Sequence, residues 1–314
     1  MNALVSILIP AYNAARFVER ALQSATAQTH QNLEIIVVDD GSRDGTAKIV
    51  KGVNDTRITY IYQDNAGPGS ARNTALRRCR GEYVSFLDAD DYYHPRKIER
   101  QLDFLKTNPR YKIVYCNALH VYADRPHRIY KKKDVYRSGR ILPELLTSSY
   151  VNPNAVLVAR EVFERIGGFV ETRYYPEEWD LWLRMTLAGF EFGYLDEDLV
   201  TVEIREGSNT TMEIQPIAKR YAITMFEKLL PAPMSVDGVV CSAARAVRSL
   251  RPKLALACLA NGQRQEFAAE LAQMLGRGPW THLVACGLMI TPRWVVRRLW
   301  RVNQLRNSVV AGRS

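Results

Sequence analysis

The chain has 314 residues, with 43 Lys plus Arg against 33 Asp plus Glu and a formal net charge of +10. This length suits one catalytic domain with an appendage. Five cysteines without Cys-x-x-Cys spacing argue against a disulfide framework and against a zinc site. The chain leads from its start directly into an apolar run, without a basic segment, so we expect no secretory signal peptide.

The first predicted element is a strand near the start of the chain. The segment that starts at Ser6 contains a continuous apolar run over residues 7–9, which is typical of a strand buried on both faces. The run breaks into a loop that begins with Pro10, Ala11 and Tyr12. A helical pattern over residues 17–27 follows, so strand, loop and helix open an alternating α/β arrangement.

A second predicted strand has the same pattern. β-Branched residues lead through positions 35–38 into Asp39 and Asp40, and Gly41 follows directly. Either carboxylate can accept the ring N–H of a uracil or thymine. A further helical pattern covers residues 46–53.

A turn-rich loop then leads into another helix. Asn65 and Gly67 belong to this loop, and a helical pattern follows over residues 71–78. Arg72 is therefore expected about one turn inside the helix. Its guanidinium can hold phosphate or ribose oxygens.

The most informative segment is an apolar strand that ends in clustered carboxylates. Asp88, Ala89, Asp90 and Asp91 follow Leu87, and three clustered acids are costly unless a positive group lies among them. Mg²⁺ or Mn²⁺ prefers oxygen ligands and is usually held by one or two carboxylates together with substrate phosphates. We assign Asp90 to the metal and Asp88 to the metal or the ribose hydroxyls. The alternative is a solvated acidic turn.

These strands alternate with helices, and another helical pattern covers residues 95–105. Alternation of this kind predicts a mostly parallel sheet with right-handed crossovers. Ligands of such sheets bind beyond the carboxyl ends of the strands. Six polar residues should meet there and form a nucleotide site: Tyr12, Asp39, Asp40, Arg72, Asp88 and Asp90.

The chain resembles the family 2 glycosyltransferases, through five motifs in order over about the first 90 residues. The motifs are Ile9-Pro10-Ala11-Tyr12-Asn13, Val38-Asp39-Asp40-Gly41-Ser42, Asn65-Ala66-Gly67, Ser70-Ala71-Arg72-Asn73 and Leu87-Asp88-Ala89-Asp90-Asp91. The resemblance implies an α/β fold of the GT-A type, with a Rossmann-like, mostly parallel sheet flanked by helices. It also implies a nucleotide-sugar donor, by default a UDP-sugar, a Mn²⁺ or Mg²⁺ cofactor, and inversion at the anomeric carbon.

A sixth match is the acidic opening of a predicted helix over residues 176–184. In the family the second acid of this motif is taken as the general base, which here is Glu178. The family usually has aspartate at that position, so Glu177 or Asp180 is an alternative base. Acids at a helix N-terminus also complement the helix dipole, and this structural role is compatible with the catalytic one.

The donor-binding residues implied by the resemblance extend from the first strand to a segment after the last one. Arg205 matches a basic residue that follows the last strand in the family and could reach the diphosphate, or could pair with a neighbouring glutamate. The full set is Pro10, Ala11, Tyr12, Asp39, Asp40, Asn65, Gly67, Arg72, Asp88, Ala89 and Arg205.

The positive charge is concentrated in the last hundred residues. Residues 215–314 contain 15 Lys plus Arg against 4 Asp plus Glu, whereas residues 1–214 contain 28 against 29. We therefore divide the chain into a catalytic domain, 1–214, and a basic α-helical C-terminal region, 215–314. The helices predicted in this region cover residues 236–250, 252–259, 266–275 and 291–302.

The last of these predicted helices is basic and amphipathic. Arg293, Arg297 and Arg301 share one side, and Trp300 lies with apolar residues on the other. This pattern suits an anionic membrane surface, although a helix packed on its own domain is the alternative. No apolar segment is long enough to span a bilayer. We expect a cytoplasmic protein, peripheral on the inner face of the cell membrane, that uses a glycan or lipid-linked acceptor in polysaccharide or lipopolysaccharide synthesis.

Other functions fit the sequence less well. No nucleic-acid-binding motif accompanies the basic charge, so we expect no nucleic-acid partner. A sugar-phosphate nucleotidyltransferase should have a glycine-rich phosphate loop where this chain has Pro10-Ala11-Tyr12-Asn13. The remaining alternative is a catalytically inactive, nucleotide-binding scaffold of a membrane glycan-assembly complex. The acids at Asp88, Asp90 and Glu178 argue against it.

Overall fold

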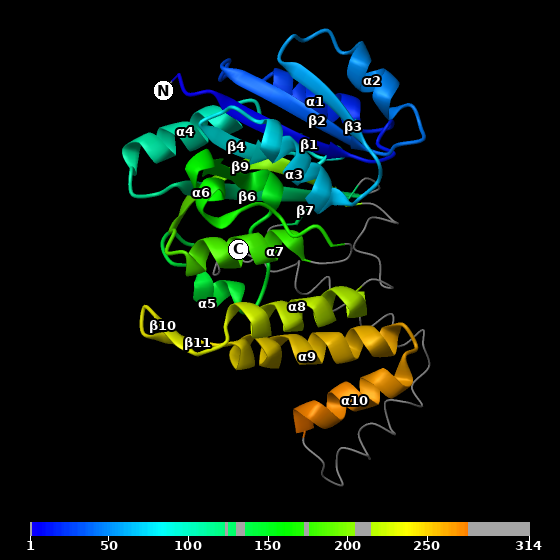
Figure 1. Cartoon of the computed structure of the whole chain (residues 1–314), viewed down its shortest axis with the longest axis vertical. Coiled ribbons are helices and arrows are strands. Elements are labelled where there is room, and N and C mark those ends of the chain that lie inside the picture. The colour runs from blue at the N-terminus through cyan, green and yellow to red at the C-terminus, as the bar shows by residue number, and fades with distance from the viewer. Residues whose placement is uncertain (1, 123–124, 130–135, 173–175, 205–214, 276–314) are drawn as a thin grey trace.

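A nine-stranded sheet forms the centre of the fold, in the order β3-β2-β1-β4-β8-β6-β9-β5 with β7 paired to β6 (Figure 1). The computed structural model describes residues 2–122, 125–129, 136–172, 176–204 and 215–275. The strands are β1 (Val5–Ala11), β2 (Leu33–Asp40), β3 (Ile58–Gln63), β4 (Tyr83–Phe86), β5 (Tyr92–Tyr93), β6 (Ile113–Tyr122), β7 (Arg125–Ile129), β8 (Val156–Ala159) and β9 (Phe192–Ile204).

The first four strands are parallel, as the alternating pattern predicts. Ala11 of β1 lies opposite Asp39 of β2, and Leu8 lies opposite Phe86 of β4. The carboxyl ends of β1, β2 and β4 therefore share one edge of the sheet. β8 is antiparallel to both β4 and β6, and β9 is parallel to β6, so the sheet is mixed but mostly parallel.

Helices cover both faces of the sheet because side chains alternate along each strand. Ile7 and Ile9 of β1 belong to the core under α1 and α4, whereas Leu8 belongs to the core under α3, α6 and α7. The helices of this part are α1 (Val18–Thr26), α2 (Thr46–Gly52), α3 (Pro68–Arg78), α4 (Lys97–Thr107), α5 (Leu142–Leu145), the 3₁₀ turn η2 (Pro153–Ala155), α6 (Arg160–Ile166) and α7 (Glu177–Leu187).

The C-terminal region contains a hairpin that sequence patterning missed. We expected a helix over residues 236–250. Instead, Asp237 and Gly238, which both have a positive φ, form a two-residue turn between two short strands. An Asp-Gly pair of this kind is typical of a type I′ hairpin. Helix starts only after Ser242, whose side chain caps it by accepting from the Arg245 N–H. The elements are α8 (Gln215–Leu229), β10 (Met234–Val236), β11 (Val239–Cys241), α9 (Ala243–Ala260) and α10 (Arg264–Leu275).

Helix α9 also runs through Pro252, where we expected a break. An interior proline costs about 3 kcal/mol because it removes a backbone donor. On both sides of Pro252, Leu250, Leu254 and Cys258 are buried against the adjacent helices. The burial of these side chains outweighs the unfavourable effect of proline on the helix.

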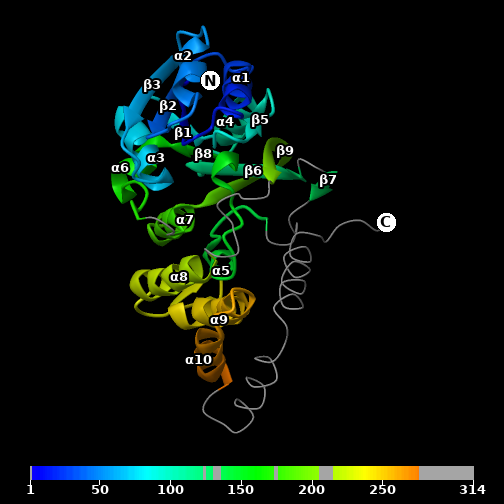
Figure 2. The same cartoon turned by 90° about the vertical axis from the view of Figure 1, so that its right-hand side faces the viewer.

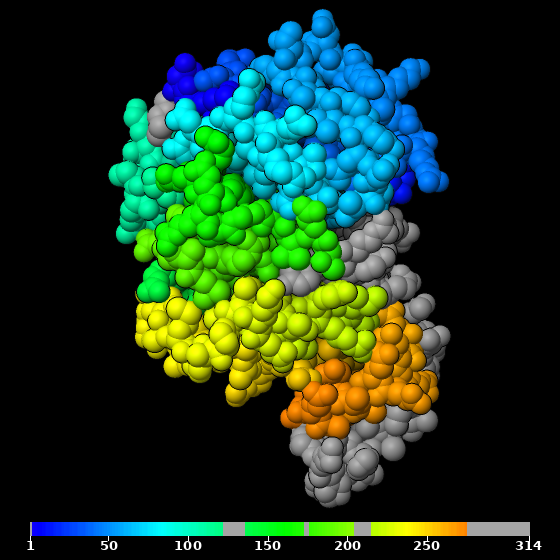
Figure 3. All heavy atoms as spheres, in the orientation of Figure 1, coloured from blue at the N-terminus to red at the C-terminus, as the bar shows by residue number. Residues whose placement is uncertain are grey.

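Helix α8 packs beneath α7, and α9 packs against α8, as both views show (Figures 1 and 2). The ring of Phe226 in α8 meets Trp179 of α7 edge to face, with 5.2 Å between ring centroids. In the space-filling view the C-terminal helices lie against the middle of the chain (Figure 3). The charge boundary at residue 214 thus coincides with the start of α8, and one buried cluster includes residues from both sides of it.

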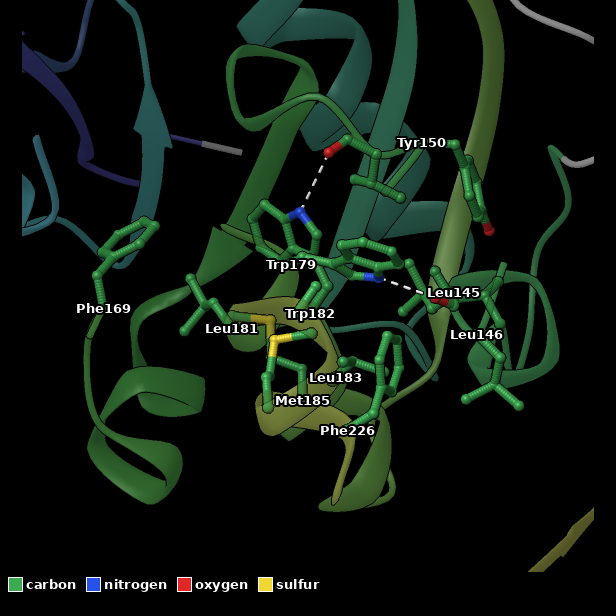
Figure 4. Close-up of a cluster of buried hydrophobic side chains, with 14 of the residues drawn as sticks. Leu145, Leu146, Tyr150, Phe169, Trp179, Leu181, Trp182, Leu183, Met185 and Phe226 are labelled. Atoms are coloured by element: carbon green, nitrogen blue, oxygen red, sulfur yellow. Dashed lines mark hydrogen bonds between the residues drawn. The ribbon is translucent and has the colours of Figure 1, made fainter. Parts of the chain in front are cut away.

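The two tryptophans of α7 are core residues. Trp179 is 8% exposed and Trp182 is fully buried. Their indole N–H groups donate to the carbonyls of Leu145, at 2.8 Å, and Val151, at 3.1 Å (Figure 4). Their burial assigns them to packing rather than to stacking on an acceptor. Among the described residues, none of the helices is both long and apolar enough to cross a bilayer.

Lys97 of α4 is a fully buried cation between the sheet and α4. Its ammonium donates to Ser85 Oγ at 2.6 Å and to the Val156 carbonyl at 3.2 Å, and it lies 4.2 Å from the centre of the Tyr93 ring. Burial lowers the pKa of Lys97 to about 7. Between that pH and its usual pKa, the unfolded chain binds more protons than the folded one, so stability rises with pH.

We therefore expect Lys97→Met to remove this pH-dependent gain. The free energy of unfolding of the variant minus that of wild type, measured by urea titration, should be larger at pH 7 than at pH 9.5. Lys106→Met, at an exposed position of the same helix, serves as the control. An equal difference between Lys97→Met and wild type at both pH values would contradict the assignment.

Candidate active site

The loops that follow β1 and β2 are joined to each other. The Asn13 N–H donates to Ser42 Oγ, and the Arg43 N–H donates to Asn13 Oδ1, both at 2.9 Å. Asn13 itself adopts a left-handed conformation, with φ of 48°. The preceding Tyr12 is 55% exposed at the end of β1, so its ring is available to a ligand at this edge.

Asp39 and Asp40 are both buried at the end of β2. Asp39 accepts hydrogen bonds from the Ser42 N–H, at 2.8 Å, and from the Tyr60 hydroxyl, at 2.7 Å. A carboxylate has about four acceptor sites, so Asp39 retains capacity for another donor. Asp39 is thus a hydrogen-bond acceptor that is held in place at the carboxyl end of β2.

Asp40 holds the loop that contains Asn65 and Gly67. Its two oxygens accept from the N–H groups of Ala66, at 2.9 Å, and Gly67, at 2.8 Å. The next residue, Gly41, has φ of 82°, and a Cβ there would lie 2.8 Å from the Asn65 nitrogen. The acid and the glycine together place the loop that enters α3.

Arg72 is the centre of the site. It is 5% exposed and lies one turn inside α3, as expected. Its guanidinium pairs with Asp88, at 2.7 Å, and with Glu177, at 3.1 Å, and lies 5.4 Å from the centre of the Phe169 ring. Burial lowers its pKa, but Asp88, Glu177 and Glu178 raise it further, so the net pKa is raised and the guanidinium stays charged.

The three acids of α7 have different surroundings. Burial, together with the neighbouring Glu178, raises the pKa of Glu177 to about 7 although Arg72 opposes the shift. Asp180 is 3% exposed and pairs with Arg184 at 2.5 Å. Glu178 is half-buried at the start of the helix.

The two proposed metal ligands lie at the carboxyl end of β4. The side chain of Asp88 is 30% exposed, and Asp90 is half-buried. In the described part of the chain, no group of three or more His, Cys, Asp or Glu side chains is placed to hold an ion. Two oxygen donors nevertheless fit Mg²⁺ or Mn²⁺, because these ions commonly complete their shell with substrate phosphates.

Sequence analysis missed two residues that hold this acidic turn. Asn154 is fully buried and bonds to the turn from η2, and Arg20 bonds to it from α1. Neither belongs to a recognisable motif, although Pro153 next to Asn154 marks a constrained turn. Arg205 and the predicted helix 291–302 lie outside the described residues.

Comparison with known proteins gives the family. Residues 6–167 match the model described as Glycosyl transferase family 2. An uncharacterized glycosyltransferase of Rickettsia typhi is 34% identical over 228 residues, which are 71% of this chain and 70% of that protein. The chain belongs to glycosyltransferase family 2, which confirms the resemblance.

Other relatives differ in length or are better characterised. A Rickettsia conorii glycosyltransferase is 35% identical over 190 residues, but the match spans only 31% of its length. The Escherichia coli protein WfaP, a UDP-Glc:alpha-D-GlcNAc-diphosphoundecaprenol beta-1,3-glucosyltransferase, is 32% identical over 195 residues, 60% of this chain and 72% of that one.

Two solved structures share the fold. S. aureus TarS 1-349, in complex with UDP-GlcNAc, gives a TM-score of 0.62 at 18% identity and covers 95% of this chain and 92% of its own. The mannosyltransferase PcManGT from Pyrobaculum calidifontis, in complex with GDP-Man and Mn²⁺, gives 0.59 at 20% identity, with 96% and 84% covered. The predicted GT-A fold is confirmed.

The raised pKa of Glu177 predicts a pH-dependent stability. The folded chain binds a proton at Glu177 more tightly than the unfolded chain, so this contribution to stability is present at low pH and is lost as pH rises through about 7. Relative to wild type, Glu177→Gln should therefore be more stable at pH 8.5 than at pH 5.5, as measured by thermal unfolding. Glu164→Gln, at an exposed position, is the control, and a pH-independent difference for Glu177→Gln would refute the assignment.

Proposed function

We propose that this protein transfers a sugar from a nucleotide-sugar donor, by default a UDP-sugar, to a hydroxyl group of a glycan or lipid-linked acceptor, with inversion at the anomeric carbon. The observation that carries the proposal is the Arg72 guanidinium, which is paired with Asp88 at the strand ends and with Glu177 of the acidic helix. One acid from the proposed donor-binding edge and one from the helix that carries the proposed base thus pair with the same cation. UDP-GlcNAc in TarS and UDP-Glc in the name of WfaP support a uridine donor.

The nucleotide is assigned to the edge formed by β1 and β2. Asp39 would accept the ring N–H of the base, and the exposed Tyr12 offers an aromatic face to it. Asp40 would act indirectly, because its oxygens already hold the loop after β3. The other donor contacts that we carry over from the family are Pro10, Ala11, Asn65, Gly67, Arg72, Asp88, Ala89 and Arg205.

Mn²⁺ or Mg²⁺ would be held by Asp88 and Asp90 together with the donor diphosphate, and the Mn²⁺ in PcManGT supports a divalent ion as cofactor. The ion would offset negative charge on the departing diphosphate. Arg72 already pairs with Asp88, so it keeps one ligand acid oriented and partly neutralised. This arrangement limits repulsion between the acids before the donor arrives.

Glu178 is our candidate for the base. Glu177 and Asp180 each accept from an arginine, Arg72 or Arg184, whereas the family motif places the base at position 178. Glu178 takes the proton of the acceptor hydroxyl, and that oxygen attacks the anomeric carbon. The bond from this carbon to the diphosphate oxygen breaks, and the diphosphate leaves with the electron pair. A single displacement of this kind inverts the anomeric configuration.

Two observations support a lipid-linked acceptor: the name of a relative and the positive charge of the C-terminal region. WfaP is named for a diphosphoundecaprenol acceptor, and residues 215–314 carry an excess of 11 positive charges, from 15 Lys plus Arg against 4 Asp plus Glu. A basic segment favours contact with the anionic inner face of a membrane, where lipid-linked acceptors are found. We infer a role in surface polysaccharide or lipopolysaccharide synthesis, with a hexosyl or N-acetylhexosaminyl donor.

The first test is calorimetric titration with UDP, GDP, dTDP and a panel of UDP-sugars, each with and without Mn²⁺. Wild type should bind one nucleotide sugar in a metal-dependent manner, and Asp90→Ala should lose the metal dependence. Asp103→Ala, at an exposed position of α4, is the control. Metal-dependent binding that survives in Asp90→Ala would refute the metal assignment.

The second test separates binding from transfer. Glu178→Gln should bind the donor as wild type does but should lose transfer by roughly 10²- to 10⁴-fold, the usual contribution of general base catalysis. Sugar transfer to a lipid-linked acceptor is the assay. Unchanged transfer would move the base to Glu177 or Asp180.

The membrane proposal has its own test. Removal of residues 291–314 deletes the tryptophan- and arginine-rich segment and should reduce sedimentation with anionic phosphatidylglycerol vesicles, while binding to neutral phosphatidylcholine vesicles stays low. Metal-dependent donor binding by the truncated chain controls for folding. Unchanged partitioning into anionic vesicles would contradict the proposal.

A further inference from the structure

We propose that Asn154 is a positioning residue for the divalent-cation site, which fixes the acidic turn formed by residues 88–91 without contacting the ion. The proposal rests on the proposed function, since it takes Asp88 and Asp90 as the ligands. It assigns a role to an asparagine that lies 63 residues from the turn in sequence, the separation between Asn154 and Asp91.

Asn154 bonds to both ends of the acidic turn. Its Oδ1 accepts from the Asp88 N–H at 2.8 Å, and its Nδ2 donates to Asp91 Oδ2 at 2.5 Å. A longer contact of 3.4 Å joins the same Nδ2 to Asp88 Oδ2. One amide group thus sets the backbone at the start of the turn and the side chain at its end.

Asn154 is itself held rigidly. It is fully buried in η2, and its N–H donates to Asn152 Oδ1 at 2.8 Å. Pro153 limits the backbone before it. β8 starts two residues later, at Val156, and pairs with β4, the strand that leads into the turn. The amide is therefore anchored to the same sheet as the acids that it orients.

Asp91 supplies the link to a second strand. It is 4% exposed, and its Oδ1 accepts from the Glu203 N–H of β9 at 3.0 Å. Within the turn, the Asp91 N–H donates to the Asp88 carbonyl at 3.0 Å. The third acid of the motif is thus engaged in structure, which leaves Asp88 and Asp90 as the partly exposed pair.

Arg20 of α1 also holds the turn. It donates to the Asp90 carbonyl at 3.1 Å, pairs with Glu203 and lies 4.5 Å from the centre of the Tyr92 ring. The turn is consequently fastened to α1, η2 and β9 before any ligand binds. Such preorganisation reduces the ordering cost of binding and favours the ion.

The amide chemistry of Asn154 matters as much as its position. A neutral side chain both donates and accepts, so it can hold a backbone N–H and a carboxylate at once. An aspartate would accept the Asp88 N–H but would repel Asp91. Residues that orient metal ligands in this way typically change metal affinity 10- to 100-fold when they are mutated.

The test is calorimetric titration of UDP at increasing Mn²⁺, combined with thermal unfolding, on the full chain. Asn154→Ala should raise the Mn²⁺ concentration needed for half-maximal UDP affinity by roughly tenfold or more. Asn154→Ser should act in the same direction and serves if the alanine variant does not fold. The matched control is Asn108→Ala, an asparagine at the end of α4.

A double exchange tests the hydrogen-bond pair itself. Asn154→Asp alone places a fourth carboxylate beside the turn and should weaken Mn²⁺ dependence, whereas Asn154→Asp with Asp91→Asn restores one donor and one acceptor between the two positions. The double variant should recover part of the Mn²⁺ dependence that Asn154→Asp loses. No recovery in a folded double variant would overturn the hydrogen-bond explanation.

The outcomes distinguish this inference from the proposed function. If wild type binds UDP with Mn²⁺ dependence and folded Asn154→Ala keeps the same dependence, Asn154 is only structural and the inference fails. A lower unfolding temperature with unchanged Mn²⁺ dependence leads to the same conclusion. If wild type itself shows no Mn²⁺ dependence, the proposed metal site fails instead.

Discussion

One buried cation determines how the site is assembled. Arg72 is nearly inaccessible to solvent, yet it pairs with two carboxylates that come from distant parts of the chain, Asp88 and Glu177. A buried charge is tolerated only when it is paired and hydrogen-bonded. Without Arg72, the acids of the strand edge and of α7 would repel one another across the site. Asp40 holds the loop that precedes α3, and α3 places Arg72. The position of this helix therefore affects both Asp88 and Glu177.

Local patterns predicted the elements that local forces determine. β1 and β2 were recognisable because strands covered on both faces are continuously apolar, and the turns after them because proline, glycine and clustered acids interrupt such runs. The same patterns placed Arg72 one turn into α3. In the C-terminal region the helix predicted over residues 236–250 is wrong around Asp237 and Gly238, because the apolar spacing indicates a helix whereas the Asp-Gly pair forms a hairpin turn.

The rest of the site depends on contacts between distant segments. Nothing near Asn154 in the sequence indicates that it faces Asp91, because that contact follows from β8 lying antiparallel beside β4. The surroundings of Glu177 and Asp180 likewise depend on the arginine that each one meets, Arg72 of α3 and Arg184 of α7. Residue types and spacing could nominate the three acids of α7 as a group. They could not distinguish Glu177 from Glu178, because the partner of Glu177, Arg72, comes from α3.

The contact between Trp179 and Phe226 has a practical consequence for the boundaries of the protein. The region after residue 214 differs from the preceding part in charge, but both contribute to one buried cluster. A fragment ending at residue 214 would expose the apolar underside of α7, the helix whose first turn carries Glu177 and Glu178. The smallest independently folding unit with an intact site should therefore retain at least α8 and α9.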